Sequence, residues 1–85
     1  MIPEVLDAEY VRDFIISVRF ADGQAGTVDL HDVLQGPMFE PLKNKEMFRQ
    51  FSIHPQFKTL CWDNGADIAP EFLYEHLRLL EVVYP

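Results

Sequence analysis

Hydrophobic residues in the first third of the chain recur at every second position, which is the period of a β-strand. The clearest apolar face is made by Phe14, Ile16, Val18 and Phe20. A weaker alternation from Leu6 to Tyr10 predicts a strand before it. Asp22-Gly23 is a hairpin signal and precedes a returning strand over residues 25–29. The first 29 residues therefore predict a three-stranded meander.

The hydrophobic period then changes to that of a helix. The segment from Asp29 to Gly36 has apolar residues at i, i+3 and i+4, and both of its end residues suit helix caps. The segment from Asn44 to Gln50 predicts a second short helix, capped by its first residue, which buries Met47 and Phe48. We expect a connecting loop between these two helices.

The stretch Leu60–Glu71 predicts a strand, a tight turn and the start of a helix. Strands are expected over Phe51–His54 and Phe57–Trp62, and Asn64-Gly65 predicts a type I′ turn with a short returning strand. The last helix is predicted from Pro70, a favourable first residue, to about Val83. Its apolar stripe consists of Phe72, Leu73, Leu77, Leu80 and Tyr84.

These elements predict an α+β fold. We expect a mostly antiparallel sheet of about five to six short strands, formed by an N-terminal meander and a C-terminal hairpin. Two short helices and a longer C-terminal helix pack on the sheet. At 85 residues the chain is expected to be a single domain over 1–85, without a linker or a DNA-binding extension.

Composition and charge exclude several classes of function. Seven basic and fourteen acidic residues give a net charge of −7, which opposes binding to phosphate backbones and anionic lipids. No apolar run is long enough to span a bilayer. A single cysteine cannot form an internal disulfide and fits a reducing compartment. We therefore expect a cytoplasmic protein that binds neither nucleic acid nor membrane.

Acidic side chains gather between Asp63 and Glu71, but their spacing does not match a calcium-binding loop. Counted from Asp63, an EF-hand loop would need glycine at the sixth position and glutamate at the twelfth, where the chain has Ile68 and Tyr74. Asp63 is better explained as a turn residue and Glu71 as a partner of the helix dipole. We expect neither a metal site nor a cofactor.

No arrangement of residues in the sequence indicates catalysis. His31, His54 and His76 lie far apart, and none has a partner at the spacing of metal ligands. Cys61 lies in an apolar strand, where a thiol is usually buried and inert. The protein is therefore expected not to be an enzyme.

Trp62 has two interpretations. As a core residue it fills the space between sheet and helix, and as an exposed residue beside the turn it anchors a protein contact. Burial is favoured for so large an aromatic residue. The candidate interaction surface predicted from this region consists of Trp62, Asp63, Asn64, Asp67, Glu71 and Tyr74.

Several segments resemble the family called Domain of Unknown Function 2442. They are, in order, Phe20-Ala21-Asp22-Gly23, Val28-Asp29-Leu30, Phe39-Glu40-Pro41-Leu42 with Phe48, and Trp62-Asp63-Asn64-Gly65-Ala66-Asp67-Ile68-Ala69-Pro70-Glu71-Phe72-Leu73-Tyr74. The last segment is the most specific. The resemblance implies a small bacterial or archaeal α+β protein with no established catalytic residues. Some relatives carry a helix-turn-helix domain, and others are encoded beside another small protein.

The resemblance and the acidic composition together predict a regulatory module that binds another protein. The partner would be the product of a neighbouring gene, with this chain as its antitoxin-like member. Two alternatives remain open at this point. One is an enzyme or small-ligand binder that uses the Trp62–Glu71 region, and the other is a structural homo-oligomer that pairs through a sheet edge.

Overall fold

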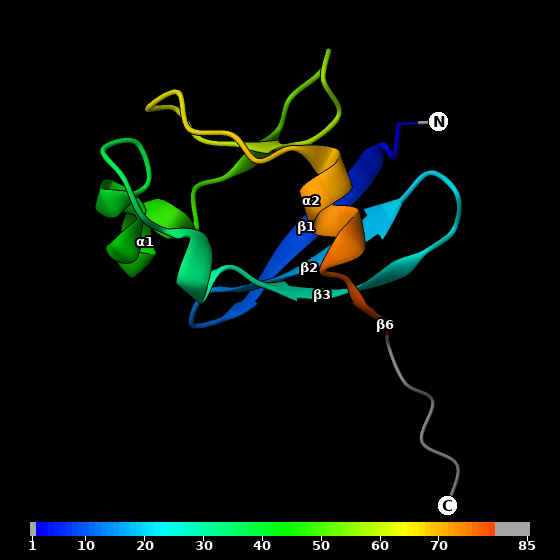
Figure 1. The fold of residues 1–85 in the computed structure, drawn as a ribbon, viewed down its shortest axis with the longest axis horizontal. Helices are drawn as coiled ribbons and strands as arrows, with labels where there is room; N and C mark the ends of the chain where they lie inside the picture. The colour runs from blue at the N-terminus through cyan, green and yellow to red at the C-terminus, as the bar shows by residue number, and fades with distance from the viewer. Residues whose placement is uncertain (1, 80–85) are drawn as a thin grey trace, which may run out of the picture.

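A computed structural model describes residues 2–79 of the protein (Figure 1). The elements follow one another as β1 (Val5–Arg12), β2 (Ile15–Phe20), β3 (Ala25–Asp29), the 3₁₀ turns η1 (His31–Val33) and η2 (Glu40–Lys43), α1 (Lys45–Phe48), β4 (Ser52–Ile53), β5 (Leu60–Cys61), α2 (Pro70–Glu75) and β6 (Arg78–Leu79). All described strand pairs are antiparallel and the helices are short, so the fold is α+β.

The described strands form two separate sheets. The larger sheet has the order β1-β2-β3-β6, and β4 and β5 form a second sheet of two strands. The predicted meander is confirmed as β1, β2 and β3. The predicted single sheet of about five to six strands is not confirmed, because β4 and β5 form their own two-stranded sheet, to which Asp67 adds a single antiparallel bridge opposite Cys61.

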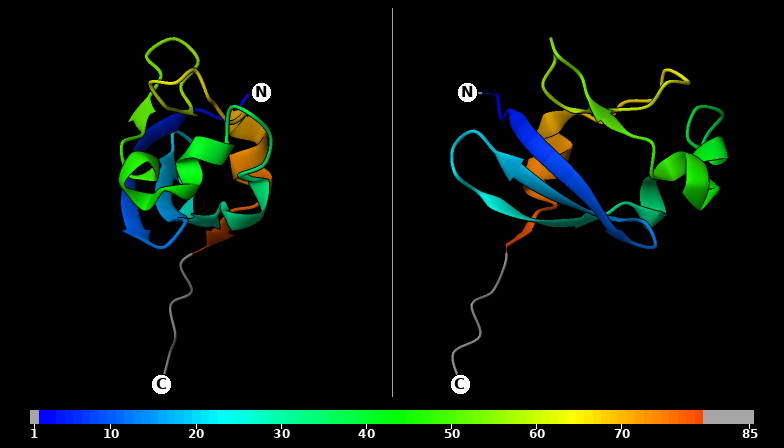
Figure 2. Two further views of the ribbon diagram at one scale, coloured as in Figure 1. Left: turned by 90° about the vertical axis from the view of Figure 1, so that its left-hand side faces the viewer. Right: turned by 180° about the vertical axis from the view of Figure 1, so that it is seen from behind.

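One face of the larger sheet is covered and the other is open. Helix α2 lies in front of the strands in Figure 1 and behind them in the reverse view of Figure 2. The covered face contributes Ile16, Val18 and Phe20 to the core, each at most 1% exposed. Ser17 and Arg19 point to the opposite face, as the alternation predicts. Strand β2, which has the clearest alternation, therefore forms the centre of the fold.

Strand β1 departs from the predicted alternation at its start. The register shifts between Val5 and Asp7, so Val5 lies opposite Phe20 and is buried at 1% exposure. Leu6 is the additional residue of this irregularity and is 50% exposed. The alternation predicted from Leu6 to Tyr10 therefore holds for Ala8 and Tyr10, which are half-buried, but not for Leu6, because the bulge changes which residues face the core.

The predicted helices are shorter than expected. The segment 29–36 forms only the single turn η1, since Gly36 adopts a positive φ of 89° and Pro37 follows it. Asn44 caps α1 as predicted, with its Oδ1 accepting hydrogen bonds from two backbone amides. Phe48 is buried, but Met47 is 42% exposed, so the predicted burial of Met47 is wrong.

The last helix begins at Pro70 as predicted but ends at Glu75 rather than near Val83. After His76 the chain turns, and Arg78 and Leu79 pair with Thr27 and Gly26 of β3. The predicted continuation through residues 80–83 lies outside the described residues. Pairing with the open edge of β3 replaces helical hydrogen bonds that the sequence pattern alone favoured.

Two hairpin turns of the fold share one design. In each, the third loop residue is a glycine with positive φ, Gly23 at 95° and Gly65 at 92°. The residue before it accepts a hydrogen bond from the amide two positions on, as Asp22 does from Gln24 and Asn64 from Ala66. The predicted type I′ turn at Asn64-Gly65 is wrong, since Asn64 does not have positive φ.

Candidate interaction surface

Trp62 belongs to the core and not to the surface. Its side chain is 5% exposed, and its indole Nε1 donates a hydrogen bond of 2.9 Å to the backbone oxygen of Phe48. The Trp62 ring lies 5.9 Å from the Phe48 ring and 6.4 Å from that of Phe51, measured between centroids. The hollow beside it measures only about 50 Å³. Trp62 therefore cannot present its ring to a partner, and we no longer count it as part of the candidate interaction surface.

Asp63 and Asn64 lie in the turn that follows Trp62. The side-chain nitrogen of Asn64 donates a hydrogen bond of 2.9 Å to the backbone oxygen of Met38, and its side-chain oxygen accepts one from Ala66. The nitrogen of the Asn64 side chain thus ties this turn to the loop of Met38, and its oxygen stabilises the turn itself. These contacts give Asn64 a structural role that follows from its position in the turn.

Asp67 and Glu71 lie on another part of the surface, at the start of α2. They line a hollow of about 470 Å³ together with Ile2, Glu4 and Phe57. Ile2 is 67% exposed and Phe57 is 61% exposed. This hollow thus combines two exposed apolar side chains with three carboxylates.

The loop that carries Phe57 is held in place by a histidine. Nδ1 of His54 accepts hydrogen bonds from the backbone amides of Gln56 at 3.1 Å and Phe57 at 3.0 Å. The imidazole also stacks on the Phe57 ring, with 4.5 Å between centroids. The next residue, Lys58, has a positive φ of 53°, and its oxygen accepts a hydrogen bond from Val5. The exposed Phe57 ring is therefore positioned by a fixed turn.

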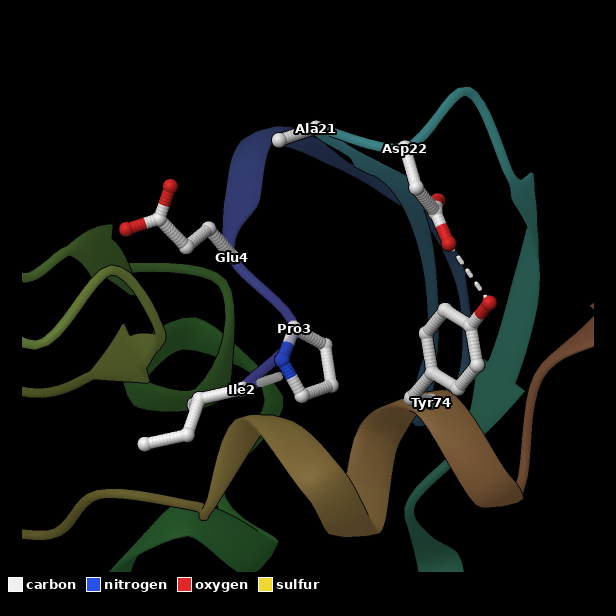
Figure 3. Close-up of a pocket in the computed structure, with 6 residues that line it drawn as sticks. All are labelled: Ile2, Pro3, Glu4, Ala21, Asp22 and Tyr74. Carbon is white, nitrogen blue, oxygen red and sulfur yellow. Dashed lines mark hydrogen bonds between the residues drawn. The ribbon is translucent and has the colours of Figure 1, made fainter.

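Tyr74 lines a second, neighbouring hollow of about 530 Å³ with Ile2, Pro3, Glu4, Ala21 and Asp22 (Figure 3). The Tyr74 hydroxyl donates a hydrogen bond of 2.6 Å to Oδ2 of Asp22. This bond, with that from the Gln24 amide, lowers the pKa of Asp22 below its ordinary value. The same bond raises the pKa of Tyr74, because it favours the neutral phenol. Asp22 is therefore an ionised carboxylate fixed beside an aromatic ring.

The two hollows share Ile2 and Glu4, so they form one continuous surface. We call it the Ile2 surface and define it by Ile2, Pro3, Glu4, Ala21, Asp22, Phe57, Asp67, Glu71 and Tyr74. The structure thus brings together Asp67, Glu71 and Tyr74 of the residues predicted from the sequence. The others, Trp62, Asp63 and Asn64, do not line it.

Sequence reasoning missed Ile2, Asp22 and Phe57. The sequence pattern predicts Phe57 as part of a strand, whereas in the structure it lies in the turn closed by His54 and followed by Lys58 with positive φ. Asp22 is a turn residue by its local sequence, and its contact with Tyr74 spans 52 positions. No signal in the local pattern indicates such a contact.

The described side chains form no metal-binding cluster. Within residues 2–79, no three His, Cys, Asp or Glu side chains gather where they could hold one metal ion. Cys61 is partly buried, with its Sγ 3.4 Å from Oγ of Ser52. No helix in the described part of the chain has the length and apolarity to cross a membrane.

These features define a small antiparallel α+β domain with an apolar surface bordered by carboxylates. The sequence model of the family described as "Protein of unknown function (DUF2442)" matches residues 5–78. The chain therefore belongs to this family, which confirms the resemblance in its motifs. No curated protein and no solved structure matches the chain.

Proposed function

We propose that the protein is a non-catalytic interaction module that binds a basic partner protein through the Ile2 surface. The observation that carries this proposal is the grouping of exposed apolar side chains around two adjoining hollows. Ile2, Phe57 and Tyr74 are 67%, 61% and 36% exposed. Single exposed apolar residues are ordinary, but a group bordered by polar residues is typical of a protein contact.

The charge of the Ile2 surface favours a basic partner. Glu4, Asp22, Asp67 and Glu71 line the two hollows, and no lysine or arginine does so among the described residues. The net charge of −7 adds a long-range attraction for a positively charged protein. Complementary charge accelerates association and excludes acidic partners. The proposed partner is thus a basic protein with apolar side chains at its contact surface.

The packing around Trp62 argues against an enzyme or small-ligand site at Trp62 itself, whereas Asp67 and Glu71, at the other end of the Trp62–Glu71 region, line the hollow of about 470 Å³ on the Ile2 surface. A ligand pocket of ordinary size encloses about 300–1,000 Å³, whereas the hollow beside Trp62 measures about 50 Å³. The Trp62 ring and the Asn64 amide fill this region with contacts inside the chain. These residues support the fold.

We further propose that the partner is the product of a neighbouring gene and that this chain acts as its antitoxin-like member. The decisive test is co-expression of the two proteins, followed by purification of the complex and measurement of growth. We expect a stable complex and relief of any growth defect that the neighbour causes alone. A failure to form the complex contradicts the pairing with that partner.

Matched variants locate the contact surface. Phe57→Asp places a charge on the Ile2 surface, whereas Val11→Asp places the same charge on an apolar residue that is 47% exposed and does not line either hollow. We expect Phe57→Asp to weaken the complex at least about tenfold and Val11→Asp to leave it unchanged. Equal effects of the two variants contradict the proposed surface.

A further inference from the structure

The hollow beside Tyr74 has the shape and the chemistry of a site for one cationic side chain. Its walls are the apolar residues Ile2, Pro3 and Ala21 and the ring of Tyr74, and Asp22 provides a carboxylate on one side. In Figure 3 the carboxylate of Glu4 extends away from Asp22 and Tyr74. Asp22 is therefore the acidic group placed against the aromatic ring.

The carboxylate of Asp22 is held firmly but retains unused hydrogen-bonding capacity. Its Oδ1 accepts from the Gln24 amide at 2.9 Å, and its Oδ2 accepts from the Tyr74 hydroxyl at 2.6 Å. A carboxylate has about four lone-pair positions, so one remains on each oxygen. Two free positions on adjacent oxygens fit the two parallel N–H groups of a guanidinium.

The Tyr74 ring adds a second reason to expect a guanidinium. The ring packs edge-on against Phe20, with 5.0 Å between centroids and an angle of 80°, so its orientation is fixed. A planar guanidinium can stack on an aromatic face while it binds a carboxylate, which the compact ammonium of lysine does less well. The apolar walls can cover the aliphatic part of the same side chain.

We propose that the hollow formed by Ile2, Ala21, Asp22 and Tyr74 receives an arginine side chain of the partner protein. The guanidinium binds the two oxygens of Asp22 and stacks on Tyr74, while Ile2 and Ala21 contact the methylene groups. This inference rests on the proposed interaction function. It deepens that function by naming the residue type that the surface selects.

The test is an NMR titration of the full chain with N-acetyl-arginine amide, which has the side chain and no competing carboxylate. We expect the amide signals of Asp22, Gln24 and Tyr74 to shift and to saturate. N-acetyl-lysine amide and the uncharged N-acetyl-citrulline amide should bind at least about threefold more weakly. Equal binding of the three compounds overturns the proposal.

Two matched variants test the residue assignment. Asp22→Asn keeps the acceptor for the Gln24 amide and removes the charge, whereas Glu75→Gln removes a charge from exposed Glu75, which does not line the hollow. We expect Asp22→Asn to weaken arginine binding about tenfold and Glu75→Gln to leave it nearly unchanged. Equal losses would indicate attraction by net charge alone and overturn the site.

The experiments distinguish a failure of the arginine site from a failure of the proposed interaction function. If a partner complex forms but is insensitive to both Asp22→Asn and added N-acetyl-arginine amide, the arginine site is wrong and the interaction module stands. If N-acetyl-arginine amide binds the hollow with the expected selectivity while no basic protein binds the Ile2 surface, the site stands and the proposed function is wrong.

Discussion

Replacement of Trp62 by phenylalanine tests whether this residue is part of the scaffold. The variant removes the hydrogen bond of 2.9 Å from the indole to the Phe48 oxygen and reduces the ring that lies between Phe48 and Phe51. A buried carbonyl left without a partner costs about 1–3 kcal/mol. The lost ring atoms add about 1 kcal/mol, because the side chain is 5% exposed and leaves a small cavity.

The expected loss is therefore about 2–4 kcal/mol in the free energy of unfolding. A chain of 85 residues has a total stability of roughly 4–13 kcal/mol, so this loss is a large share of it. Urea unfolding followed by far-ultraviolet circular dichroism measures the change. Fluorescence of the wild type gives an independent check, since Trp62 is the sole tryptophan of the chain and should emit as a buried indole.

Phe51→Leu is the matched control. It removes an aromatic contact with Trp62 but keeps the hydrogen bond to Phe48, so we expect a smaller loss of about 1 kcal/mol. The structural role of Trp62 is refuted if Trp62→Phe changes stability by less than about 0.5 kcal/mol. Wild-type emission at the wavelength of a solvent-exposed tryptophan would refute it as well.

Three further substitutions test contacts elsewhere in the fold. His54→Ala should lower the free energy of unfolding by about 1–2 kcal/mol, as loss of the acceptor for two backbone amides predicts, and speed hydrogen exchange at Phe57. Gly65→Ala should cost about 1–3 kcal/mol in urea unfolding, because its φ is 92°. Tyr74→Phe should raise the pKa of Asp22 toward its ordinary value, as measured by NMR. The wild type, whose folded-state pKa is lowered, loses the associated stability as pH falls through that value, and the variant should show a smaller loss, because the Gln24 amide still donates to Asp22.

The sequence predicted those elements whose partners lie nearby in the chain. The strand over residues 25–29 is predicted correctly because the Asp22-Gly23 signal turns the chain back along the preceding strand, whose period of two is clear. Asn44 was recognised as a cap because a cap contacts the amides two and three positions ahead. Such contacts are local, so the residue types themselves contain the information.

The errors arose where distant segments decide the structure. Leu73 and Leu77 have helical spacing, but the chain leaves the helix after Glu75 because β3 offers unpaired backbone groups at Gly26 and Thr27. The candidate site was predicted only in part for the same reason. Its carboxylates near Glu71 were recognised, whereas Ile2 and Asp22 reach it from other parts of the chain.

The pairing of β3 with β6 makes completion of the larger sheet a late event in folding. Gly26 pairs with Leu79 and Thr27 pairs with Arg78. These partners are synthesised only after all the elements from η1 to α2. Until then the outer edge of β3 offers its N–H and C=O groups to any other extended chain. A nascent or truncated chain that ends before Arg78 therefore leaves this edge of β3 unpaired, and pairing with the two residues of β6 protects it.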